Sequence, residues 1–96
     1  MKQIKPARAD KEIDDERVRV TRFTFEPGAE TGWHTHEMDY VIVAVSDCEM
    51  LLEEPNGASR EVDVAAGEVY RRDKGVNHNV VNRGSSPMVF VEVELK

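Results

Sequence analysis

Residues 67–82 read GEVYRRDKGVNHNVVN, and this stretch does most to decide the fold. The residues of this stretch on which the interpretation depends are Gly67, Gly75, His78 and Asn82. Glycine adopts the backbone angles of tight turns without steric cost, so the two glycines are expected to bracket a short strand. His78 would then lie just beyond a turn. A lone histidine in such a place is commonly a turn residue, so its meaning depends on the rest of the chain.

Residues 33–36 read WHTH and contain the other two histidines of the chain, His34 and His36. In an extended strand, residues i and i+2 point to the same side, so both imidazoles can bind one ion. Neutral imidazole is a good ligand for first-row transition metals. An isolated pair of this kind is usually a polar pair on a solvated face. Together with His78, it predicts a metal site made by all three histidines.

Length, charge and cysteine content limit the classes of protein to which the chain can belong. The chain has 96 residues, enough for one small domain, and 13 basic against 19 acidic residues give a net charge of −6. No cluster of basic and aromatic residues indicates nucleic-acid binding. No apolar run suits a signal peptide or a membrane span, so we expect a cytoplasmic protein that binds a small molecule. The single cysteine, Cys48, cannot form an internal disulfide and is interpreted as a packing residue.

Most of the chain reads as short strands separated by turns. Residues 40–45, YVIVAV, are continuously apolar and predict a strand buried on both faces. Asn56-Gly57 predicts a hairpin turn. In residues 88–95, MVFVEVEL, the valines share one parity while Glu92 and Glu94 share the other. This pattern predicts a buried valine face and a solvent-exposed glutamate face. These patterns are typical of an all-β protein, an antiparallel β-barrel or sandwich.

The N-terminal part of the chain is rich in charged residues. We expect residues 1–16 to form an arm and residues 17–96 to form the barrel domain. The only helical signal is a turn or two over residues 9–16. Within residues 18–25 the large apolar side chains change parity, which predicts a β-bulge near residues 21–22.

The two histidine segments resemble the two sequence motifs of the cupin family. The first, G-x5-H-x-H, is matched from Gly28 to His36. The second, G-x5-P-x-G-x2-H-x3-N, is matched from Gly67 to Asn82, with Asp73 where proline is usual. In its sequence the chain most resembles small single-domain bacterial cupins of the β-alanine degradation type. The resemblance implies a cupin jelly-roll barrel, a bound metal and a homodimer.

The fourth metal ligand of the family pattern has no direct match. Cupins usually supply a glutamate separated from the second histidine by three or four residues, and here those positions hold Tyr40 and Val41. The nearest carboxylates are Glu37 and Asp39. Asp39 immediately precedes the expected strand, so a shortened loop would bring its oxygen to the metal. The sequence leaves open whether Asp39 completes the set or the site has three histidines alone.

The ligand set and the resemblance together predict a metal-dependent enzyme acting on a small carboxylate- or carbonyl-bearing metabolite. The donors suit several divalent metals, among them Fe, Mn, Ni and Zn. Dioxygenase chemistry is the first expectation, with lyase or isomerase chemistry close behind. The alternative is a sensor or storage module that binds a metal or a ligand without turnover. Strand phase does not reveal which polar side chains face the cavity among Arg22, Tyr40, Glu53, Arg71 and Arg72.

Overall fold

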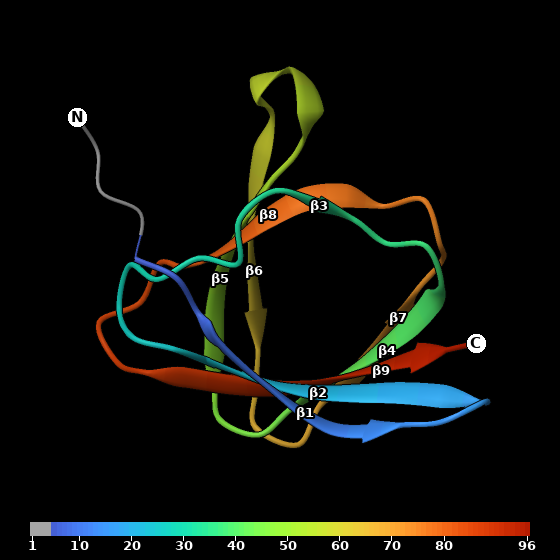
Figure 1. Ribbon diagram of the computed structural model, residues 1–96. Coiled ribbons are helices and arrows are strands. Elements are labelled where there is room, and N and C mark those ends of the chain that lie inside the picture. Colours follow the sequence, from blue (N-terminus) through green and yellow to red (C-terminus); the bar gives the residue numbers. More distant parts are fainter. Residues whose placement is uncertain (1–4) are drawn as a thin grey trace.

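The computed structural model describes residues 5–96, which form strands joined by short turns (Figure 1). The strands are β1 (Arg8–Asp14), β2 (Val18–Phe25), β3 (His34–Thr35), β4 (Asp39–Ala44), β5 (Cys48–Glu53), β6 (Ser59–Val64), β7 (Val69–Arg72), β8 (Asn77–Asn82) and β9 (Met88–Leu95). A short 3-10 turn, η1 (Pro55–Gly57), joins β5 to β6. None of the described residues forms a helix long and apolar enough to span a membrane.

The strands form two antiparallel sheets that enclose one interior. The first has the order β1-β2-β9-β4-β7 and the second the order β3-β8-β5-β6. In Figure 1 the two sheets face each other, with β1, β2 and β9 on one side and β3 and β8 on the other. The prediction of an all-β jelly-roll barrel is confirmed, because every strand pairing within the two sheets is antiparallel.

The interior is filled mainly by aromatic and aliphatic side chains from both sheets. Phe25 and Phe90 are buried, and their ring centroids lie 5.3 Å apart. Phe23 adds a third ring, 5.5 Å from that of Phe90. Met50 and Ile42 are buried in the same cluster. Packing of this kind supplies most of the stability of a small barrel, since the free energy gained scales with the apolar area removed from water.

The turns largely follow the sequence-based expectation. Gly67 and Gly75 have φ angles of +87° and +99°, a region that side-chain-bearing residues rarely adopt. Asn56 and Gly57 also have positive φ angles, of 71° and 78°, as the predicted hairpin turn between β5 and β6 requires. The turns at Gly67 and Gly75 fix where β7 and β8 begin and therefore where His78 lies.

Two predictions for the N-terminal third are wrong. The segment 9–16 does not contain a turn of helix, because residues 8–14 form β1 and pair with β2. Strand β1 therefore extends the barrel sheet into the segment assigned to an arm. The predicted bulge near residues 21–22 is also absent, since β2 pairs with β9 in unbroken register, and the irregularity lies in β1 between Lys11 and Ile13.

The burial of β4 and β9 also differs from expectation. Strand β4 alternates, with Tyr40 and Ile42 buried in the interior and the intervening valines only half-buried on the outer face. In β9 the polarity is reversed. Glu92 and Glu94 are each 8% exposed and face the interior, while Val91 and Val93 face outward. The change of parity in β2 has the same cause, because its outer face also carries valines.

Candidate metal centre

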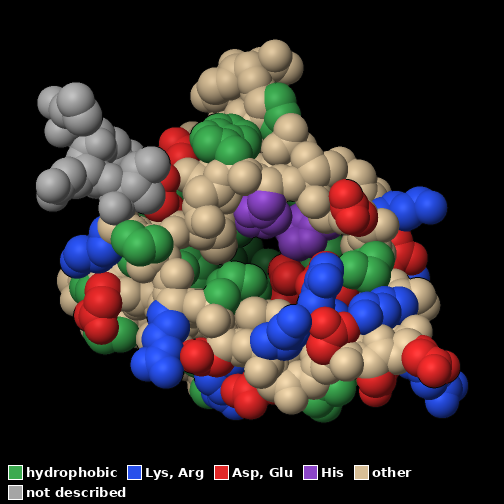
Figure 2. Space-filling view, in the orientation of Figure 1, with side chains coloured by type: hydrophobic (Ala, Val, Ile, Leu, Met, Phe, Trp, Pro, Cys, Tyr) green, Lys and Arg blue, Asp and Glu red, His purple; other side chains and the backbone are tan. Residues whose placement is uncertain are grey.

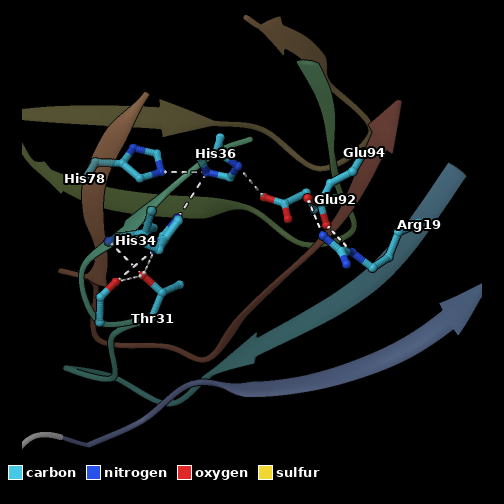
Figure 3. A network of polar contacts seen from close by, with 9 residues as sticks. Arg19, Thr31, His34, His36, His78, Glu92 and Glu94 are labelled. Carbon is cyan, nitrogen blue, oxygen red and sulfur yellow. Dashed lines mark hydrogen bonds and ion pairs between the residues drawn. The ribbon is translucent and has the colours of Figure 1, made fainter. Parts of the chain in front are cut away.

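The three histidines converge at one end of the barrel interior (Figure 3). His34 of β3 lies directly across from His78 of β8 in the antiparallel register, and His36 follows β3. The Nε2 atoms of His34 and His36 are 3.0 Å apart, and those of His36 and His78 are 3.1 Å apart. One ring nitrogen from each residue lies within 4.8 Å of the other two. The structure therefore brings together all three predicted histidines.

A backbone contact fixes the tautomer of His34. Its Nδ1 atom lies 2.9 Å from the carbonyl oxygen of Gly32. A carbonyl oxygen only accepts hydrogen bonds, so Nδ1 must carry the proton and donate. In the neutral form of the ring, the Nε2 atom then presents a lone pair toward His36. This is the arrangement in which a protein orients an imidazole for metal binding.

Burial keeps the other two imidazoles neutral. It lowers the pKa of His36 to about 4, an effect to which the neighbouring His34 contributes. It lowers the pKa of His78 to about 3, with further contributions from His34, His36, Arg72 and Arg60. Metal binding requires unprotonated nitrogen, so at neutral pH no proton has to be removed from these two rings before they bind an ion.

The spacing of the nitrogens fits a first-row divalent ion. Two ligands that each lie about 2.1 Å from one ion are about 3.0 Å apart at a right angle and about 3.4 Å apart at the tetrahedral angle. The two Nε2 separations, 3.0 Å and 3.1 Å, match the right angle. Three histidine ligands occupy only part of the coordination sphere of such an ion and leave other positions open, unlike a closed structural zinc site. The donor set thus fits a metal with exchangeable positions.

Asp39 does not join this group. Its Oδ1 atom accepts a hydrogen bond from the backbone nitrogen of Lys74 at 2.8 Å, and its Oδ2 atom lies 3.9 Å from the guanidinium of Arg71. Asp39 begins β4 with its side chain on the outer face, the parity opposite to Tyr40. The shortened loop does not bring the Asp39 carboxylate to the histidines. The carboxylate instead closes the turn before β8.

Tyr40 occupies the position where cupins usually place a glutamate. Its ring stacks on His36, with 3.8 Å between the centroids and 17° between the planes. The side chain is only 2% exposed, and its hydroxyl has no hydrogen-bond partner in the described part of the chain. Burial raises the pKa of Tyr40, so the phenol stays protonated. It therefore orients His36 by packing.

A pair of buried glutamates lies next to His36, and the sequence reading missed it. The Glu92 carboxylate is 3.9 Å from His36 Nδ1, and Glu94 accepts two hydrogen bonds from Arg19, at 2.9 Å and 3.1 Å (Figure 3). Burial and the charge of Glu94 raise the pKa of Glu92 to about 7. The available signal was that Met88 and Phe90 share the parity of both glutamates.

A cavity of about 250 Å³ lies beside the histidines. In Figure 2 the histidines border a hollow in which hydrophobic side chains are visible. The walls are mainly aromatic and aliphatic, and the polar groups gather near the histidines. The lining residues are Phe23, Thr31, His34, Tyr40, Ile42, Met50, Tyr70, His78, Val80, Phe90 and Glu92. Such a cavity suits a compact organic ligand.

The structure shows which face of the sheet carries each polar side chain whose orientation the sequence left open. Arg22 pairs with Glu12 and Arg71 with Asp39, both on the outer face of the sheet. Glu53 accepts a hydrogen bond from Asn79. Tyr40 and Arg72 lie directly across from each other on β4 and β7, on the inner face. Arg72 is therefore the arginine of this group that lies on the inner face of the sheet.

Cys48 and Asn82 have structural roles, as the sequence predicted for Cys48. Cys48 is buried, and burial raises the pKa of its thiol, which makes it a packing residue. Asn82 donates to the carbonyl oxygens of Phe25 and Ser86 and accepts from the backbone of Gly84. It thereby joins the ends of β2, β8 and the turn before β9.

Residues 21–94 match the Cupin domain family, so the chain belongs to the cupins. It is 47% identical over 85 residues to the beta-alanine degradation protein BauB of Pseudomonas aeruginosa, with 88% of each protein covered. It is 30% identical over 84 residues to an oxalate-binding protein of Thermotoga maritima, covering 86% of this chain and 67% of that protein. A cupin domain from Bordetella pertussis has a similar crystal structure, with a TM-score of 0.94, 45% identity, and 100% and 99% of the two chains covered.

Proposed function

We propose that the protein binds a divalent transition metal through His34, His36 and His78. The observation that carries the proposal is the convergence of three Nε2 atoms, one of them with its lone pair fixed by the bond from His34 to Gly32. The Nε2 atom of His36 lies about 3 Å from the Nε2 atoms of both other histidines, a spacing at which ring nitrogens need a cation or a shared proton between them. Iron, manganese, nickel and zinc all accept such a ligand set.

We further propose that the loaded protein is an enzyme acting on a small carboxylate- or carbonyl-bearing metabolite. Three neutral ligands leave the charge of a divalent ion uncompensated, which favours anionic, chelating substrates. Bound there, the metal would polarise a substrate oxygen and, if redox-active, support dioxygenase chemistry. The chain's own contribution is a cavity with mainly apolar walls and a buried carboxyl, Glu92, whose pKa is raised by burial and by Glu94 toward the range used in proton transfer.

A second candidate is a cupin that binds a metal and a small acid without turning it over. The relative named as an oxalate-binding protein favours this reading. Lyase or isomerase chemistry is the further alternative within the enzyme class. Oxygen consumption by the iron-loaded protein would favour a dioxygenase, turnover without oxygen would favour a lyase or isomerase, and saturable binding with neither would favour the binding module.

The metal assignment is tested by elemental analysis of protein purified without a histidine tag. We expect close to one metal per chain in the wild type and at least a tenfold loss of affinity in His78→Ala. Asp39→Ala is the matched control and should retain the metal, because the Asp39 carboxylate binds Lys74 and Arg71. The wild type should also gain thermal stability from added metal, whereas His78→Ala should not. Equal metal content in wild type and His78→Ala would overturn the assignment.

We also propose that the protein is a homodimer formed by stacking of the five-stranded sheet on that of a second copy. Strands β2, β9, β4 and β7 carry valines on their outer face, and Val69 is 59% exposed. A contiguous aliphatic face of this kind is uncommon on a monomer. A twofold interface uses the same face of both copies, which this valine face can supply.

A further inference from the structure

The two sheets leave a seam where their edge strands β6 and β7 lie, and this seam forms a second hollow. Its volume is about 260 Å³, and the residues that line it are Leu52, Arg60, Val62, Tyr70 and Arg72. Two arginines therefore flank a largely apolar groove. The same tyrosine, Tyr70, also lines the cavity beside the histidines. Tyr70 therefore borders both the seam and the cavity.

Arg72 differs from the arginines around it. Arg60 is 2.6 Å from Glu54, and Arg71 lies 3.9 Å from Asp39. Within residues 5–96, Arg72 makes neither a side-chain hydrogen bond nor an ion pair, although it is half-buried on the inner face. A guanidinium that has lost part of its hydration and has no carboxylate beside it is suited to bind the carboxylate of a ligand, in a planar two-bond arrangement.

Arg72 also lies next to the histidine cluster. It lines a smaller hollow of about 150 Å³ together with His78. Its positive charge is among the causes that lower the pKa of His36 and of His78, after burial. Arg72 and His78 border the same hollow, and His78 also lines the larger cavity, so a ligand held at His78 is within the neighbourhood of Arg72.

We propose that Arg72 determines substrate specificity by binding the carboxylate of a short organic acid whose second oxygen-bearing group faces the three histidines. This inference rests on the proposed function, since it assumes that the histidines are where the ligand is held or transformed. The small cavity volume and the mainly apolar walls favour an unbranched acid of a few carbons, either a dicarboxylate or an oxo acid.

The test is direct binding of oxalate, malonate, succinate and propionamide to metal-loaded protein by titration calorimetry. We expect Arg72→Gln to weaken binding of the best dicarboxylate by about tenfold to a hundredfold, the usual effect of losing hydrogen bonds to a charged group. Arg71→Gln is the matched control, because it removes the same charge one residue away on the outer face. It should change the affinity less than twofold. Propionamide, which has no charge, should bind weakly and equally to all variants.

A second variant and a second readout keep the outcomes distinct. Arg72→Lys keeps the charge but not the planar fork, so its affinity should lie between those of the wild type and Arg72→Gln. Metal content should be unchanged in both variants. Unaltered dicarboxylate binding in metal-loaded Arg72→Gln would overturn this inference and leave the metal site intact. Arg72-dependent binding to a wild type that takes up no metal would support it and overturn the metal proposal.

Discussion

The two faces of strand β9 differ in polarity, and their orientation is the reverse of that in a simple soluble sheet, with the polar face inside and the apolar face outside. Glu92 and Glu94 point into the barrel, and Val91 and Val93 point out of it. Alternation along a strand defines two faces, but it does not say which face is inside. Which face lies inside therefore depends on what each face contacts. The glutamate face contacts a buried site, and the valine face contacts a proposed second copy of the chain.

The inner face itself is divided along β9. Met88 and Phe90 lie in the apolar core, and Glu92 and Glu94 lie at the histidine end. Burying a carboxylate is costly unless it is paired or neutral. Glu94 is paired with Arg19, and the raised pKa of Glu92 favours its neutral form. One half of the face therefore stabilises the barrel, and the other half serves the site.

The largest expected difference between the faces is in stability. Phe90→Ala should lower the free energy of unfolding by about 3–5 kcal/mol, because it empties the centre of the phenylalanine cluster. Val91→Ala, the next residue on the outer face, should cost only about 1 kcal/mol, since its methyl groups are half-buried. Urea denaturation of metal-free protein at low concentration measures both. Equal losses would mean that the valine face is packed as tightly as the core.

The sequence predicted the fold and the histidines for a common physical reason. Turn glycines at 67 and 75 and the strand alternation around His34 are local features, and they act through backbone angles that depend little on distant residues. Asp39 and Glu92 could not be assigned in the same way. Their positions depend on which sheet face is enclosed and on pairing across the barrel, as with β9 beside β4. The orientation of Arg72 relative to Arg71 likewise required the register of β7.

A charge on the outer face is expected to have the next largest effect. Val93 lies between Val20 and Val41 in the centre of the valine face. Val93→Arg should weaken self-association by about a hundredfold, because burying an unpaired charge in an interface is strongly unfavourable. Analytical ultracentrifugation over a range of concentrations measures this, with Val93→Thr as the control of similar shape. A wild type that sediments as a monomer at every concentration would refute the stacking of the two valine faces.

The smallest expected effect compares one ion pair on each face of β2. Arg19 makes two hydrogen bonds to Glu94 on the inner face, whereas Arg22 contacts Glu12 on the outer face. Arg19→Met should cost about 1–2 kcal/mol, because it leaves the Glu94 carboxylate enclosed without its partner, although the exposed part of Arg19 reduces the loss. Arg22→Met should cost about 0.2–1 kcal/mol, as is usual for an exposed pair.

Chemical denaturation of both variants, repeated with Glu94→Gln in each background, isolates the coupling between Arg19 and Glu94. We expect Glu94→Gln to recover much of the loss in Arg19→Met and nothing in Arg22→Met. Recovery would show that enclosure of the carboxylate, and not the loss of the arginine's packing, sets the cost at the inner face. If the two arginine variants were equally stable, water would reach Glu94 as freely as it reaches Glu12. The histidine end of the barrel would then be an open basin and not an enclosed site.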